Sequence, residues 1–158
     1  MGFVYEAEHA ILGRKAALKT LAPDLAGDND FRERFIRESQ MVAALDHPSI
    51  IPIYDAGEVG GIVYIAMRHV SGGDLSNEID AGKLDADRAI LILEQVAGAL
   101  DAAHDHGLVH RDVKPANVLL DGEGGRAYLT DFGIAKQARS KGLTRTGFFV
   151  GTRDYAAP

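Results

Sequence analysis

The residues with the clearest chemical potential are two aspartates, a lysine and an asparagine between positions 112 and 131. Residues 110–117 read His-Arg-Asp-Val-Lys-Pro-Ala-Asn, and Asp131 opens an Asp-Phe-Gly triplet. Phosphoryl transfer from a nucleotide needs one carboxylate that accepts the proton of the attacking hydroxyl, and a cation beside the transferred phosphate. It also needs an amide oxygen and a second carboxylate to hold Mg²⁺. The spacing therefore suits Asp112 as the base, Lys114 as the cation, and Asn117 and Asp131 as metal ligands.

Two short apolar runs are expected to place the metal ligands. The runs at 118–120 and 127–130 flank a glycine-containing segment, which predicts a hairpin. Asn117 and Asp131 then lie at the two ends of this hairpin, where their side chains can converge on one ion. The neighbouring His110 and Phe132 are expected to be packing residues.

The ordered set of His-Arg-Asp, Lys, Asn and Asp-Phe-Gly resembles the catalytic loop and metal-binding triplet of the protein kinases. Lys114, two residues after Asp112, resembles the serine/threonine branch rather than the tyrosine branch. A structural turn with ordinary solvated charges is the alternative, but such a turn does not need all of these residues in this order. The resemblance runs from Gly2 to Pro158. It implies ATP and Mg²⁺ as cofactors, with Leu119 beneath the adenine.

The N-terminal residues predict a strand pair that turns near Gly13. Gly2 and Val4 resemble the end of the kinase glycine-rich loop, although an ordinary turn glycine is an equal alternative for Gly2. The Ala-Leu-Lys run that ends at Lys19 resembles the third kinase strand. This implies that Ala17 borders the adenine and that Lys19 binds the α- and β-phosphates, whereas a surface lysine is the plain alternative. Because the first strand and other glycines of the family loop are not matched, we expect the natural chain to begin further upstream.

A helix is expected from a cap at Asn29 or Asp30 to about Leu45. The apolar residues that recur at helical spacing are Phe31, Phe35, Val42 and Leu45. Glu38 lies on this helix among arginines, and a solvated charged face is its plain interpretation. The resemblance implies instead that Glu38 is the helix-C acid, which pairs with Lys19 and orients it for phosphate binding.

Residues 68–70 resemble the hinge between the kinase lobes, whose backbone binds adenine. Met67 and Val70 would border the adenine there, with Met67 guarding the back of the pocket. Ordinary core packing is an almost equal alternative for Met67. Asp74 follows a glycine pair, and it either reaches the ribose or caps the next short helix.

Three further elements complete the pattern. Two strands and the turn between them are predicted at residues 51–55, 62–67 and 57–61. A long helix is predicted to start at a cap formed by Asp85 and to end at Gly107. Its stretch 89–93 is apolar on every side, which calls for neighbours on every side. His104 and His106 near its end suit the helix dipole better than a metal site.

The C-terminal segment resembles a kinase activation segment, because residues 151–158 follow the family pattern Gly-Thr-x-x-Tyr-x-Ala-Pro. Thr144 and Thr146 resemble the paired phospho-acceptors of bacterial kinases. The resemblance implies that Arg111 engages such a phosphothreonine and that Thr152 bonds near the catalytic aspartate. A flexible polar loop is the alternative.

Composition narrows the class of protein. The 158 residues are 25% charged and 46% hydrophobic with a net charge of −6, which is typical of soluble globular proteins and argues against nucleic-acid binding. The absence of cysteine excludes disulfides, cysteine-ligated zinc and thiol catalysis. No signal peptide is visible in these residues, and no apolar run reaches the roughly 20 residues of a membrane helix. We expect a cytoplasmic kinase domain, which in the full-length protein could still be anchored to a membrane.

The sequence thus predicts an α+β, protein-kinase-like two-lobed fold: an N-lobe antiparallel sheet with helix C, and an incomplete helical C-lobe. The expected division is an N-lobe at 1–67, a hinge at 68–70 and the first part of the C-lobe at 71–158. The resemblance is to a serine/threonine protein kinase domain of the bacterial eukaryotic-like type, and we expect it to be truncated at both ends.

The predicted function is ATP-dependent phosphorylation of Ser or Thr in proteins, including autophosphorylation, for which two chains could associate as a homodimer. One alternative is an aminoglycoside-type phosphotransferase, which shares the Asp-x-x-x-x-Asn loop. The other is an inactive kinase fragment that at most binds nucleotide. The arginine before the catalytic aspartate, the Asp-Phe-Gly triplet and the threonine-rich segment favour a protein acceptor.

Overall fold

The computed structural model describes residues 2–22, 27–122 and 125–132. The predicted activation segment, with Thr144, Thr146 and Thr152, lies outside these residues. The chain divides into two compact units, and each is described by itself. The first consists of Met1–Ala44 and Ile51–His69, and the second of Leu45–Ile50 and Val70–Pro158.

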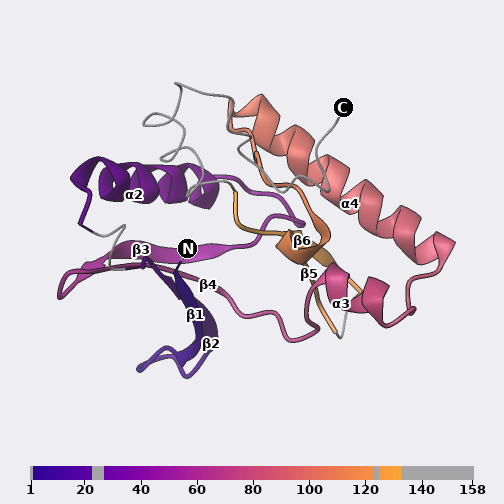
Figure 1. The fold of residues 1–158 in the computed structure, drawn as a ribbon, viewed down its shortest axis with the longest axis horizontal. Coiled ribbons are helices and arrows are strands. Elements are labelled where there is room, and N and C mark those ends of the chain that lie inside the picture. Colours follow the sequence, from indigo (N-terminus) through magenta and orange to yellow (C-terminus); the bar gives the residue numbers. More distant parts are fainter. Residues whose placement is uncertain (1, 23–26, 123–124, 133–158) are drawn as a thin grey trace, which may run out of the picture. The chain divides into compact units, whose positions relative to one another are not determined.

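The first unit contains a four-stranded antiparallel sheet (Figure 1). Its strands are β1 (Phe3–Glu8), β2 (Lys15–Thr20), β3 (Ile53–Val59) and β4 (Ile62–Arg68), in the order β1-β2-β4-β3. The predicted strand pair around Gly13 is confirmed, since β1 pairs with β2 from Phe3↔Thr20 to Glu8↔Lys15. The sheet therefore fixes which residues of β2 and β4 share a face.

The turn between β3 and β4 is shorter than predicted. The prediction assigned all of residues 57–61 to the turn, but β3 continues through Gly57 to Val59. The turn is formed by Gly60 and Gly61, whose φ angles of 59° and 79° are both left-handed. A two-residue hairpin turn with this backbone matches the twist of the strands, and glycine adopts it without steric cost.

Helix α2 (Asn29–Ala43) packs against β3. Its cap is Asp28, whose carboxylate accepts the Phe31 N–H at 3.2 Å, and not Asn29 or Asp30 as predicted. It also ends before Leu45, at Ala43. The side chains that it buries are Phe31, Phe35, Glu38, Ser39 and Val42. Three of the four predicted core positions are therefore right, and the error lies at the helix ends, where boundaries are least determined by periodicity.

Among its described residues, the second unit contains two α-helices, a 3₁₀ turn and a small hairpin (Figure 1). They are α3 (Leu75–Asp80), α4 (Ala86–Asp105), the 3₁₀ turn η1 (Pro115–Asn117), β5 (Val118–Leu120) and β6 (Ala127–Leu129). Asp85 caps α4 by accepting the Arg88 N–H at 2.7 Å, and Gly107 follows the helix with φ of 71°, as predicted. The predicted hairpin is confirmed, with Leu119 opposite Tyr128.

Helix α4 is buried along one face only. Ile92, Val96, Ala99 and Ala103 are less than 10% exposed, whereas Ile90, Leu91 and Leu93 are more than half exposed. The buried face contacts β6. Within the part of the chain that the structure describes, neither this helix nor any other is both long and apolar enough to cross a membrane.

The β5–β6 hairpin lies at the core of the second unit. Val118, Leu120, Ala127, Tyr128 and Leu129 are each at most 3% exposed. Ile50 forms a parallel bridge with Leu129, so the segment before β3 extends the hairpin on the β6 side. These contacts anchor the strands that lead to the predicted metal ligands.

Candidate active site

The predicted catalytic loop is built around a buried histidine. His110 is 1% exposed, and its Nδ1 accepts the Asp112 N–H at 3.2 Å. Its Nε2 lies 2.8 Å from the Thr130 carbonyl oxygen. Because Nδ1 accepts, the neutral Nε2–H tautomer fits both bonds. The ring also packs on Phe132, with centroids 4.7 Å apart, so both residues have the packing role that the sequence predicted.

Asp112, Lys114 and Asn117 form one contact cluster. The Lys114 Nζ lies 3.3 Å from the Asp112 Oδ2, and the Asn117 Nδ2 donates to the same oxygen at 3.2 Å. The Asn117 Nδ2 also donates to the Asp112 main-chain oxygen at 2.7 Å. The Asp112 side chain is 6% exposed and that of Lys114 is 20% exposed. A carboxylate so enclosed is held in one rotamer by two donors, as a positioned base requires.

The hairpin carries Asn117 and Asp131 at matching positions. The Thr130 N–H donates to the Asn117 carbonyl at 2.9 Å, so the ladder continues past β5 and β6 to the residue before Asp131. Asp131 and Arg111 have left-handed φ angles of 58° and 61°. Such angles are uncommon for residues with a side chain, and they concentrate where a site imposes an orientation. Both strained residues belong to the predicted site.

The donor set of the second unit fits Mg²⁺. Because the Asn117 Nδ2 donates to Asp112, its Oδ1 is the atom left to act as a ligand. Asp131 adds a carboxylate, and hard oxygen donors of this kind are what Mg²⁺ prefers. Among the described residues, no group of three or more His, Asp or Glu side chains is placed to hold an ion.

In the first unit, the sheet register places four predicted nucleotide-binding residues on one face. Val4 is opposite Lys19, and Ala17 is opposite Met67. Directly opposed residues share a face, as do residues two apart on one strand. Val4, Ala17, Lys19 and Met67 therefore lie on the same side of the sheet.

Helix α2 covers this face. Its Arg32 forms an ion pair with Glu58, which is opposite Val63 and thus on the side of Lys19. Val63, Ile65 and Met67 on this side of the sheet are buried, at 0%, 3% and 6% exposure. Glu38, the proposed partner of Lys19, is 8% exposed on α2. Glu38 thus lies on a helix that packs against β3, in the same sheet that carries Lys19 on β2.

The remaining predicted residues have distinct environments. A Cβ on Gly2 would lie 1.3 Å from the Thr20 carbonyl oxygen, so this glycine is required by a close backbone approach. Asp74 caps α3, with Oδ1 accepting the Asn77 N–H at 3.0 Å, and its backbone bridges to Leu119. Val70 and Leu119 are half-buried. The capping alternative for Asp74 is thus confirmed, and it leaves the second carboxylate oxygen outside the cap.

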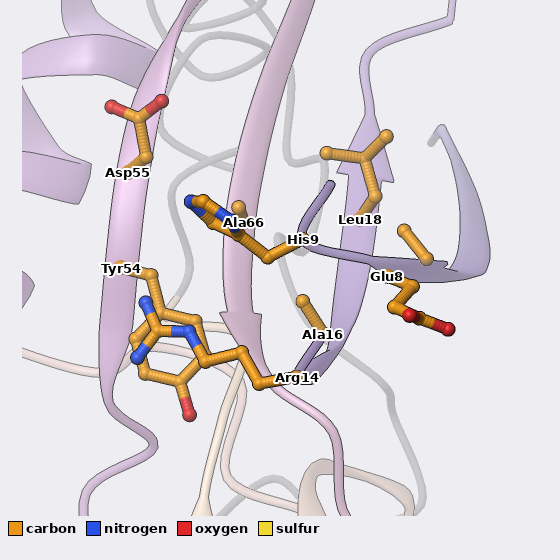
Figure 2. Close-up of a pocket in the computed structure, with 9 residues that line it drawn as sticks. Glu8, His9, Arg14, Ala16, Leu18, Tyr54, Asp55 and Ala66 are labelled. Atoms are coloured by element: carbon orange, nitrogen blue, oxygen red, sulfur yellow. The ribbon is translucent and has the colours of Figure 1, made fainter. Parts of the chain in front are cut away.

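The opposite face of the sheet bears a hollow of about 430 Å³ (Figure 2). Ala16, Leu18 and Ala66 form its floor, and the Arg14 guanidinium stacks over the Tyr54 ring at 3.9 Å. Since strand residues alternate, this floor faces away from Ala17 and Lys19. The hollow is therefore separate from the predicted nucleotide face.

The sequence did not point to three residues that hold the hairpin. A Cβ on Gly72 would lie 2.2 Å from the Leu120 carbonyl oxygen, so only glycine allows this approach. Arg88 of α4 donates a hydrogen bond to the Gly125 carbonyl, and Gln95 of α4 accepts one from the Ala127 N–H. The sequence shows only that Arg88 and Gln95 share a helix face with the apolar Ile92, and this does not reveal that the hairpin backbone lies opposite.

Comparisons with known proteins agree with this arrangement. The model of the protein kinase domain matches residues 1–158. The serine/threonine-protein kinases PknJ and PknH of Mycobacterium tuberculosis are each 45% identical to the chain over its whole length. The crystal structure of the M. tuberculosis PknI kinase domain superimposes with a TM-score of 0.76 and 44% identity over 87% of this chain.

These matches cover parts of longer molecules. The chain spans about a quarter of the length of the curated relatives, 27% for PknJ and 25% for PknH. It spans 56% of the PknI kinase domain chain. A more distant structure, Rad53 in complex with AMP-PNP, matches 83% of this chain at 29% identity with a TM-score of 0.73.

Proposed function

The chain belongs to the protein kinase domain family, and from that premise we propose that it transfers the γ-phosphoryl group of ATP to Ser or Thr hydroxyls of proteins. The observation that carries the proposal is the cluster of Asp112, Lys114 and Asn117, in which one enclosed carboxylate is held by two donors. The names of the curated relatives support a protein acceptor. The AMP-PNP complex of Rad53 supports nucleotide binding.

Each residue of the cluster has a distinct role in the proposal. Asp112 orients the acceptor hydroxyl and takes its proton as the oxygen attacks the γ-phosphorus, while the bond to the bridging oxygen of ADP breaks. Lys114 neutralises charge that develops on the transferred group. Asn117 and Asp131 hold Mg²⁺, which supplies charge neutralisation when it is bound with the nucleotide. Positioning and electrostatics thus supply most of the rate enhancement.

Residues of both units are proposed as nucleotide contacts, and the first unit supplies those to the phosphates. Lys19 binds the α- and β-phosphates, and Glu38 orients it. The proposed adenine contacts are Val4 and Ala17 of the first unit and Leu119 of the second. The remaining proposed nucleotide contacts are Gly2, Met67, Val70 and Asp74. Two observations support this part: the shared face of Val4, Ala17, Lys19 and Met67, and the burial of Glu38 on α2.

The proposal extends to regulation. Thr144 and Thr146 are the proposed phospho-acceptors, Arg111 engages the resulting phosphate, and Thr152 bonds near Asp112. The exposed Arg111 with its left-handed backbone supports this assignment, since the backbone holds the residue in a fixed direction beside the base. Autophosphorylation in trans would bring two copies together, in a cytoplasmic setting.

The substitution Asp112→Asn tests the chemical role of the cluster. We expect phosphate transfer to a Ser/Thr peptide to fall by about 10³-fold or more, because the base is removed while the shape of the side chain is kept. Binding of a fluorescent ATP analogue should change less than about threefold, since Asp112 has no ground-state contact with the nucleotide in this proposal. The measurement is single-turnover transfer together with equilibrium binding in the full chain.

A matched control is Asp101→Asn, which removes a carboxylate from the exposed face of α4 in the same unit. It should leave transfer unchanged. Turnover by Asp112→Asn at the wild-type rate would refute the assignment. Preferential transfer to an aminoglycoside rather than to peptides would replace the acceptor class and leave the phosphoryl chemistry in place.

A further inference from the structure

The β5–β6 hairpin is too short to define its own position. Each strand has three residues, and an isolated two-stranded pair is marginally stable at best. Yet Asn117 is the residue directly before β5, and a single residue, Thr130, separates the end of β6 from Asp131. The positions of both proposed metal ligands therefore depend on the contacts that surround the hairpin.

The outward-facing N–H groups of the hairpin show what these contacts are. The Val118 N–H donates to the Pro115 carbonyl, the Leu120 N–H to Gly73 at 2.9 Å, and the Leu129 N–H to Ser49 at 2.8 Å. The remaining outward group belongs to Ala127, and it donates to the Gln95 Oε1 at 2.9 Å. Three of these four acceptors are backbone carbonyls, and the acceptor for Ala127 is a side chain. A substitution can remove that acceptor without altering the backbone.

The geometry of α4 directs Gln95 at the hairpin. Arg88, Ile92 and Gln95 recur at helical spacing on one face, with Ile92 1% exposed between the two polar residues. The Arg88 Nη1 donates to the Gly125 carbonyl at 2.8 Å, at the turn end of β6. Side chains of α4 therefore form two hydrogen bonds with the backbone of this region. The Arg88 bond lies at the turn before β6, and the Gln95 bond lies within β6. Ala127 is 0% exposed, so water does not substitute for the lost acceptor.

We propose that Gln95 is a positioning residue. Its carboxamide oxygen fixes the register of β6 and the distance of β6 from α4, and thereby the placement of Asp131 relative to Asn117. This inference rests on the proposed function, because it assigns those two residues to the metal. Asp131 lies roughly 13 Å along the strand direction from Ala127, at about 3.3 Å per residue. Gln95 thus acts through β6 and does not touch the metal or the nucleotide.

The chain offers matched variants that separate the acceptor from the packing. Gln95→Leu keeps the size and helix propensity but removes the acceptor. Gln95→Glu keeps the acceptor and should restore wild-type behaviour. Gln95→Asn withdraws the acceptor by about one bond length and serves as a milder variant should the Leu protein unfold. Glu94→Leu makes the same kind of change at the adjacent exposed position of α4.

Two measurements on the full chain test the inference. Without nucleotide, amide exchange of peptides that contain Ala127 should accelerate on the order of tenfold in Gln95→Leu, because an unpaired amide reaches exchange-competent states more often. With AMP-PNP present, Mn²⁺ binding followed by electron paramagnetic resonance should weaken about tenfold in the same variant, the lower end of losses for residues that orient metal ligands. Affinity for AMP-PNP without metal should stay within about twofold. Gln95→Glu and Glu94→Leu should match the wild type in both measurements.

The outcomes are separable. Unchanged exchange, or faster exchange with unchanged Mn²⁺ affinity, in Gln95→Leu would overturn the positioning role while leaving the proposed function in place. Equal losses in Gln95→Leu and Gln95→Glu would also overturn it, because they would trace to packing. A wild-type chain that binds neither AMP-PNP nor Mn²⁺ would instead overturn the proposed function, although the exchange result would still report on the hairpin.

Discussion

The two strand pairs that carry the proposed phosphate and metal residues are built in opposite ways. In the β1–β2 pair of the first unit, Phe3, Val4 and Tyr5 are 61%, 62% and 51% exposed. In the β5–β6 pair of the second unit, Tyr128 and Leu129 are 3% and 0% exposed. The first pair has six residues in each strand and the second has three. Lys19 belongs to the exposed pair, and Asn117 and Asp131 flank the buried one.

The difference indicates how each pair keeps its shape. The long pair is held by its own ladder and by the pairing of β2 with β4, so substitutions of its exposed side chains remove little buried area. The short pair is held by its surroundings: a helix, a backbone bridge from Ile50 and a close approach by Gly72. A proposed metal site benefits from rigid support, whereas a strand pair that is proposed to cover phosphates benefits from being able to adjust.

The largest expected effect comes from truncating the buried pair. Leu129→Ala should lower the free energy of unfolding by about 2–5 kcal/mol, because it removes a fully buried side chain and leaves a cavity. Val4→Ala in the exposed pair should cost less than about 1 kcal/mol, mainly through lower strand propensity. Urea unfolding followed by far-ultraviolet circular dichroism measures both. Comparable losses in the two variants would contradict the contrast between the pairs.

A pair of glycines gives a finer comparison at intermediate size. Gly13 and Gly125 both have φ of +63°, so alanine costs about 1–2 kcal/mol of left-handed strain at either position. A Cβ on Gly13 meets nothing closer than 3.8 Å, whereas on Gly125 it lies 2.9 Å from the Arg88 Nη1. Gly125→Ala should therefore cost about 1–2 kcal/mol more, because it disrupts a hydrogen bond from a charged donor.

A double-mutant cycle identifies the source of that excess. In an Arg88→Met background the guanidinium is gone, and the two glycine substitutions should then cost the same within about 0.5 kcal/mol. The measurement is again the urea midpoint and its slope. If the excess at Gly125 persists without the guanidinium, the extra cost comes from the backbone of the turn and the Arg88 contact is incidental.

Much of the fold could be predicted from the sequence where a local rule decides it. The α+β kinase-like class, the hairpins and the long helix with its Asp85 cap are confirmed by the structure and its neighbours. The errors have local causes. Asp28 and Asn29 are both good caps, and only the backbone geometry selects Asp28. The β3–β4 segment holds three glycines, and nothing in the residues alone shows that Gly57 stays in the strand.

The candidate site was predictable residue by residue but not in its support. The spacing of Asp112, Lys114 and Asn117 pointed to one cluster, and the contacts among them now give it geometry. The roles assigned to Lys19, Glu38 and the regulatory threonines stay predictions. Gln95 was missed because its task arises from tertiary pairing: a glutamine on a helix gives no sign that a strand N–H lies opposite it.

The smallest effect is expected at the exposed end of β1 and β2, where Lys15 lies 2.6 Å from Glu6 with side chains 63% and 54% exposed. The hydrogen bond and charge of Lys15 lower the pKa of Glu6, and Glu6 in turn raises the pKa of Lys15. The contribution of Glu6 is therefore present above its ordinary pKa of 4.5 and is lost as the pH falls through the lowered folded value. Water and salt screen a pair this exposed, so Lys15→Met should leave the unfolding midpoint at pH 7 unchanged within error.

Carbon-detected NMR of the Glu6 carboxyl should nevertheless show its titration midpoint rise toward the ordinary value in Lys15→Met. A titration midpoint that does not change would mean that the two side chains are solvated separately. A pKa that moves without a change in stability is expected for a pair of exposed side chains on a strand ladder, because the ladder and not the ion pair keeps the strands together.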